Sequence, residues 1–169
     1  QIGVHGLKIG QIFAKIQCAS FLVRNNPETK QKADADIFIY NGIIENIGKN
    51  LECIQNTNII DAQGLTITPG FVDLHSHLRE PGYEYKETVA SGTRAAAKGG
   101  FTTICAMPNT SPAIDTKSSL EKLKTIIISS AIVNVLPIGA ITVNRQGKRL
   151  ASIRTLSKNG IVAISDDGD

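Results

Sequence analysis

Short apolar segments alternate with polar turns in the first part of the chain. The β-prone runs are residues 19–25, 35–48 and 57–70. The middle run contains Asn41-Gly42 between two apolar stretches, which is the strongest short-range signal for a β-hairpin. Residues 1–15 follow no clear period. We therefore predict a small β module that ends at Pro69.

After Pro69-Gly70, predicted strands alternate with predicted helices. The strand segments are residues 70–77, 101–109, 133–142 and 161–167, and the helical segments are residues 85–100, 118–131 and 149–160. Such alternation predicts a parallel sheet with right-handed crossovers, as either a doubly wound sheet or a (β/α)8 barrel. No Gly-x-Gly-x-x-Gly motif opens a helix, which argues against a dinucleotide-binding fold.

The predicted helices carry start and stop signals. Ser118 and Glu121 have the spacing of a capping box for the second helix. The third helix places three apolar residues on one face, which are Leu150, Ile153 and Leu156. Asn159-Gly160 is a typical helix end, so this helix is expected to stop there.

Composition excludes several classes of protein. The 169 residues are 41% hydrophobic and 20% charged, with a net charge of +3 and 5% aromatics. Mixed charges without a basic stripe argue against nucleic-acid binding. No apolar run approaches the roughly 20 residues of a membrane span, and no signal sequence is visible, so a cytoplasmic location is expected. Three scattered cysteines, Cys18, Cys53 and Cys105, indicate buried reduced thiols rather than a disulfide framework.

Two of the three histidines lie two residues apart at the end of the strand that follows Pro69-Gly70. Alternate residues of a strand share a face, so Asp73, His75 and His77 are expected to project together, joined by Arg79 if the extended run continues that far. Two such imidazoles can bind one Zn²⁺, although histidines on a polar strand face are often only solvated. His5 is isolated and is not expected to be a ligand.

Polar residues recur where the predicted parallel strands end. His75 and His77 end the first of these strands, Asn109 the second, and Asp166 and Asp167 the fourth. In a parallel barrel these ends open on one mouth, where active sites form. Asp167 shares a strand face with small residues that suit a crowded interior, whereas Asp166 shares one with branched apolar residues. We therefore favour Asp167 as the inward carboxylate, and a solvated turn is the alternative.

Three motifs together resemble the first half of a class I dihydroorotase of the amidohydrolase superfamily. They are TPGFVDLHSHLREPGYEYKET, AAAKGGFTTICAMPNTSP and ISDDGD. The similarity covers about residues 30–169. It implies an α/β fold in which residues 1–69 form an N-terminal β module and residues 70–169 form the first four β/α units of a (β/α)8 metal-dependent hydrolase barrel.

The resemblance also implies roles for individual residues. His75 and His77 correspond to zinc ligands, and Asp167 corresponds to a carboxylate ligand that can bridge two metals, so one or two Zn²⁺ ions are expected. Arg79 and Asn109, with His77, are expected to bind the substrate, which is dihydroorotate or N-carbamoyl-aspartate. Arg79 and Asp167 favour a dihydroorotase over an allantoinase or dihydropyrimidinase. Allantoinase-like sequences usually lack an arginine after the second histidine, and related hydantoin and dihydropyrimidine hydrolases use a carboxylated lysine in place of the aspartate.

The resemblance assigns no catalytic acid or base to this chain. In the family the catalytic acid or base is an aspartate on a later strand, and two further histidine ligands also come from later strands. Residues 1–169 are therefore expected to be the N-terminal portion of the enzyme and inactive alone. The partners expected are a small-molecule substrate and further copies of the protein. A non-catalytic scaffold for aspartate transcarbamoylase is the alternative function.

Overall fold

The computed structural model describes residues 13–22, 32–52 and 57–167, and the chain divides into two units, Gln1–Gly70 and Phe71–Asp169. His5 and Cys53 lie outside the described residues, and only the backbone of Cys18 is described. Cys105 is buried and not in a disulfide. No helix in the described ranges is long and apolar enough to cross a membrane.

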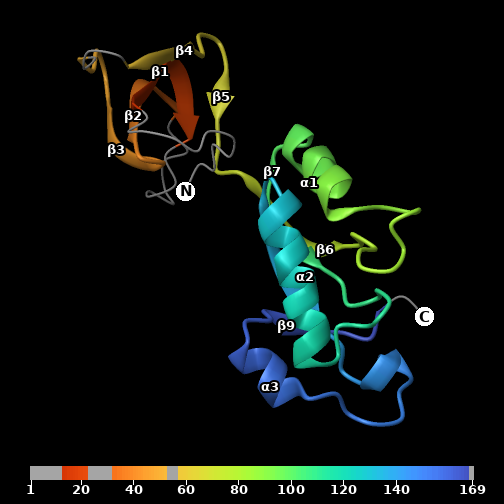
Figure 1. Cartoon of the computed structure of the whole chain (residues 1–169). Coiled ribbons are helices and arrows are strands. Elements are labelled where there is room, and N and C mark those ends of the chain that lie inside the picture. Colours follow the sequence, from red (N-terminus) through yellow and green to blue (C-terminus); the bar gives the residue numbers. More distant parts are fainter. Residues whose placement is uncertain (1–12, 23–31, 53–56, 168–169) are drawn as a thin grey trace. The chain divides into compact units, whose positions relative to one another are not determined.

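The first unit is a small β-sheet (Figure 1). Its strands are β1 (Phe13–Leu22), β2 (Lys32–Tyr40), β3 (Ile43–Gly48), β4 (Asn58–Asp61) and β5 (Thr66–Ile67), in the order β3-β2-β1-β4 with β5 also paired to β1. The predicted hairpin is confirmed. Asn41 and Gly42 join β2 to β3 with φ values of 49° and 77°, and this pair of positive φ angles is the geometry of the turn that Asn-Gly favours.

The second unit has the predicted order of alternating strands and helices. It contains β6 (Phe71–Ser76), α1 (Val89–Lys98), β7 (Phe101–Ala106), α2 (Lys117–Ser130), β8 (Asn134–Gly139), the 3₁₀ turn η1 (Val143–Arg145), α3 (Ile153–Lys158) and β9 (Ala163–Ile164). The strands are parallel in the order β6-β7-β8-β9. The sheet is curled, and α1, α2 and α3 follow one another along it (Figure 1).

Alternation along the strands separates two apolar clusters. Ile104 and Ala106 of β7 belong to the larger cluster, which contains Leu120 and Leu123 of α2. Cys105, from the opposite face of β7, packs with Met107 and Ile138 in a smaller cluster. One face of the sheet therefore packs against helices and the other faces the concave interior, as expected for barrel strands.

Two details of the predicted helices are wrong. Thr116 caps α2, and its capping box is completed by Ser119 rather than by the predicted pair Ser118 and Glu121. Helix α3 begins only at Ile153. Leu150 lies before it in a β-bridge with Thr142, and the residue is 68% exposed. The predicted stop is confirmed, because α3 ends at Lys158 and Gly160 has a φ of 90°.

Candidate metal centre

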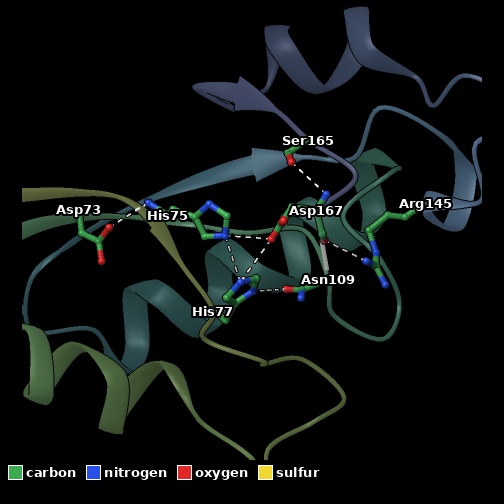
Figure 2. Close-up of polar contacts among 7 residues, drawn as sticks. All are labelled: Asp73, His75, His77, Asn109, Arg145, Ser165 and Asp167. Carbon is green, nitrogen blue, oxygen red and sulfur yellow. Dashed lines mark hydrogen bonds and ion pairs between the residues drawn. The ribbon is translucent and has the colours of Figure 1, made fainter. Parts of the chain in front are cut away.

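The end of β6 carries the two closely spaced histidines. His75 is within the strand and His77 follows its last residue, Ser76. The carboxylate of Asp73 accepts hydrogen bonds from the backbone N–H of His75 at 3.0 Å and from the Ser76 hydroxyl at 2.7 Å. The Ser76 hydrogen bond, followed by that from His75, holds the pKa of Asp73 below its ordinary value. Asp73 therefore stabilises the strand end and lies apart from the imidazoles (Figure 2).

Asp167, three residues beyond β9, reaches the same two imidazoles. Its Oδ2 lies 2.9 Å from His75 Nε2 and 3.4 Å from His77 Nε2, and the two Nε2 atoms are 3.2 Å apart. Of the residues that the structure describes, these three form the group whose ligand atoms could hold a metal ion. Figure 2 shows all three side chains pointing toward one another.

The three atoms lie within a few tenths of an ångström of the spacing of ligands around one metal. Ligand atoms about 2.0–2.2 Å from a tetrahedral Zn²⁺ are about 3.3–3.6 Å apart, and the distances here are 2.9–3.4 Å. Two neutral imidazoles and one carboxylate are also the donor types that zinc accepts. The residues present therefore fit a zinc ion.

Asn109 orients one of the imidazoles. It follows β7, the residue is 2% exposed, and its Oδ1 lies 2.9 Å from His77 Nδ1. Since an amide oxygen only accepts, His77 donates from Nδ1, and the lone pair of its Nε2 then faces Asp167 and His75. The Nδ2 group of Asn109 is buried without a partner among the described residues, so it can donate to a bound acceptor.

Asp166 points away from the imidazoles, to the end of β8. Its Oδ1 accepts from the backbone N–H groups of Ile141 at 2.9 Å and Thr142 at 3.1 Å, and its Oδ2 accepts from the Thr142 hydroxyl at 2.6 Å. Burial raises the pKa of Asp166, but the Thr142 hydroxyl and the two N–H groups outweigh this and hold the pKa below its ordinary value. The structure thus places Asp167, and not Asp166, beside the histidines.

Arg79 does not belong to the group around His75. Strand β6 ends at Ser76 and Arg79 has a φ of 63°, so the extended run does not continue to Arg79 and the condition for a face shared with the histidines is not met. Its side chain is half-buried. Within the described ranges the guanidinium forms no ion pair, and the carboxylates of Glu80 and Glu84 instead accept from the backbone N–H groups of Val89 and Gly82.

Sequence reasoning missed Arg145, which donates from Nη1 to the backbone oxygen of Asp167 at 3.1 Å. The residue lies in the loop that follows β8. The rule that polar residues gather at strand ends could have identified it, because Arg145 follows the end of the third barrel strand as Asn109 follows the second. Its partner could not be predicted, since the contact is made with a backbone atom.

Comparison with known proteins adds a family match. The family model described as Dihydro-orotase-like matches residues 64–169. The dihydroorotase of Elusimicrobium minutum is 50% identical over 152 residues, which cover 88% of this chain and 35% of that protein. The dihydroorotase of Bacillus cytotoxicus is 52% identical over 133 residues, covering 79% of this chain and 31% of that protein. The chain therefore spans about a third of the length of these relatives.

Solved structures share the fold at lower sequence identity. The L-hydantoinase (dihydropyrimidinase) from Arthrobacter aurescens has a TM-score of 0.77 at 22% identity, over 90% of this chain and 32% of that one. The D-hydantoinase (dihydropyrimidinase) from a Thermus species has a TM-score of 0.70 at 24% identity, over 89% of this chain and 32% of that one. The prediction of a half-barrel of the amidohydrolase type, preceded by a β module, is confirmed.

Proposed function

The chain belongs to the dihydro-orotase-like family, and on that premise we propose that it forms part of a zinc-dependent dihydroorotase. This enzyme would close N-carbamoyl-aspartate to dihydroorotate, or hydrolyse the ring in the reverse direction, in pyrimidine synthesis. The observation that carries the proposal is the convergence of His75, His77 and Asp167 within ligand distance of one another. The identity to curated dihydroorotases supports the choice of substrate.

In this proposal His75, His77 and Asp167 would hold the zinc ion. A zinc ion held there would lower the pKa of a bound water molecule to about 7 and would polarise a carbonyl group. The chain's own contribution is to present three donors in one place. His77 is held by Asn109 in the tautomer that frees Nε2 for a metal, and Asp73 holds the strand end from which His75 projects.

Arg79 and Asn109 are proposed to bind the substrate carboxylate. A guanidinium can hold a carboxylate through two parallel hydrogen bonds. Within the described ranges the Arg79 guanidinium forms no ion pair. The buried Nδ2 of Asn109 has an unused donor, and leaving such a group unsatisfied costs about 1–3 kcal/mol. A substrate carboxylate would satisfy it. His77 then contributes to both the metal and the substrate sides of the site.

The test uses the complete gene product that contains this chain. His75→Ala and Asp167→Ala should each reduce bound zinc, measured after dialysis, and abolish dihydroorotate hydrolysis. His5→Ala is the matched control, because this third histidine is not expected to be a ligand, and it should leave zinc and turnover unchanged. Stoichiometric zinc with normal turnover in both site variants would refute the proposal.

A further inference from the structure

The segment that carries Asp167 is held by side chains outside the metal group. We propose that Asp166 and Arg145 are positioning residues, which fix the Asp167 carboxylate opposite His75 and His77. This inference rests on the proposed function, because it assigns a purpose to contacts around the same site. It concerns the loop between β8 and α3, which no metal ligand occupies.

The sheet alone gives Asp167 little support. Strand β9 has two residues, Ala163 and Ile164. On the side toward Asp167 its pairing with β8 continues through the Ser165 N–H, which donates to the Gly139 oxygen at 2.9 Å. Asp167 lies two residues farther on. A side chain at the end of so short a ladder is free to move unless other contacts hold it.

Asp166 supplies the first of those contacts. Three donors surround its carboxylate, namely the N–H groups of Ile141 and Thr142 and the Thr142 hydroxyl, at 2.6–3.1 Å. Thr142 is itself buried, and its hydroxyl accepts from the Gly147 N–H at 2.9 Å. Asp166 therefore ties the segment that follows β9 to the loop after β8. Because Asp167 is the next residue, this tie limits where its carboxylate can lie, and the carboxylate is found beside His75 and His77.

The backbone of Asp167 is held at both ends. Its N–H donates to Ser165 Oγ at 3.0 Å, and its oxygen accepts from Arg145 Nη1 at 3.1 Å (Figure 2). With Asp166 anchored as well, the peptide groups on either side of the Asp167 Cα are fixed. Partners that orient a metal ligand in this way commonly change metal affinity or activity by about 10- to 100-fold when they are removed.

Substitution of Asp166 in the complete gene product separates positioning from direct participation. Asp166→Ala should weaken zinc binding by about 10- to 100-fold, measured by competition with a chromophoric chelator. Asp166→Asn should restore wild-type affinity, because the amide oxygen still accepts from both N–H groups and the amide nitrogen can donate to the Thr142 hydroxyl. A metal ligand or proton-transferring carboxylate would not tolerate this change, so Asp167→Asn should lose zinc.

Arg145→Ala should also weaken zinc binding, by less than Asp166→Ala, because the Ser165 contact and the Asp166 anchor remain. Arg149→Ala is the matched control, since it removes a positive charge from the same loop but an exposed one. The visible spectrum of Co²⁺-loaded protein supplies a second measurement. It should change in Arg145→Ala and Asp166→Ala and remain unchanged in Asp166→Asn and Arg149→Ala, because it reports the geometry of the ligands.

The outcomes distinguish this inference from the proposed function. Wild-type protein that binds no zinc contradicts both. Wild-type protein that binds zinc, together with an Asp166→Ala variant of equal affinity and an unchanged cobalt spectrum, contradicts only the positioning role, as does an Asp166→Asn variant that binds no better than Asp166→Ala. If Asp166→Ala does not fold, Thr142→Val tests the same anchor by removing one of its three donors, and unchanged zinc affinity there overturns the inference.

Discussion

The two polar groups of the Asn109 amide differ in whether they have a partner. Its oxygen accepts from His77 Nδ1, while its nitrogen is buried without a partner among the described residues. The first contact concerns the metal ligand and the second is available for a substrate. Because oxygen and nitrogen occupy opposite arms of the amide, substitutions can alter one contact and retain the other.

We predict that Asn109→Asp and Asn109→Leu affect zinc and substrate differently. The carboxylate introduced by Asn109→Asp would still accept from His77, so zinc affinity should be retained, but its second oxygen would repel a substrate carboxylate. A hydrogen bond to a charged group is worth about 1.5–3 kcal/mol, which corresponds to an increase of about 10- to 150-fold in KM for dihydroorotate. Leucine removes both contacts and should also weaken zinc binding.

The measurements are steady-state kinetics and zinc affinity on the complete gene product. Equal KM values for wild type and Asn109→Asp would show that Asn109 does not contact the substrate. Zinc affinity that is unchanged in Asn109→Leu would show that the hydrogen bond to His77 has no effect on metal binding.

At the scale of single residues, the alternation of side chains along a strand was sufficient to predict part of the site. It separated Asp167 from Asp166, although both lie beyond the last residue of β9, because the two carboxylates contact different partners in the structure. It does not apply at Arg79, because β6 ends at Ser76 and the backbone turns to positive φ at Arg79. It could not identify Arg145 as a partner of Asp167, since no period relates the η1 turn to a backbone oxygen at the end of β9.

At the scale of elements, the start of α2 shows how local signals compete. The run TKSSLEK offers three hydroxyl side chains before the first buried leucine, and several registers of the capping box fit it. In the structure, Thr116 Oγ1 accepts from the Ser119 N–H at 3.2 Å, and Ser119 is buried while Ser118 is exposed. Packing of Leu120 and Leu123 against the sheet selects this register, and a local pattern does not contain that information.

We predict that Thr116→Ala destabilises the protein and that Ser118→Ala does not. Loss of an N-cap hydroxyl costs about 0.5–2 kcal/mol, whereas an exposed substitution away from such a feature usually changes stability by no more than about 0.5 kcal/mol. Thermal unfolding of the complete gene product should therefore begin at a lower temperature in Thr116→Ala only. The reverse ranking would support the capping box predicted from sequence.

At the scale of the molecule, the second unit has apolar residues along both edges of its sheet. Val72 and Leu74 of β6 are 56% and 72% exposed, and Val162 beside β9 and Ile164 within it are 52% and 43% exposed. Neither edge strand pairs with a further strand among the described residues. Sequence predicted the order of these elements because alternating strands and helices permit few topologies, but it could not show which apolar positions remain exposed in the half-barrel.

A polypeptide of residues 1–169 alone should therefore associate and should be inactive. Unpaired edge strands expose rows of N–H and C=O groups that pair with other chains, and exposed apolar patches favour association. His75, His77 and Asp167 supply three ligands, and the His75 side chain is 52% exposed, so zinc should be weakly held and removed by chelators. Light scattering, zinc analysis after dialysis and a dihydroorotate hydrolysis assay test this together. A monomer that retains zinc against a chelator and hydrolyses dihydroorotate would contradict the prediction. Residues 1–169 would then stay monomeric, bind zinc and be active without further strands.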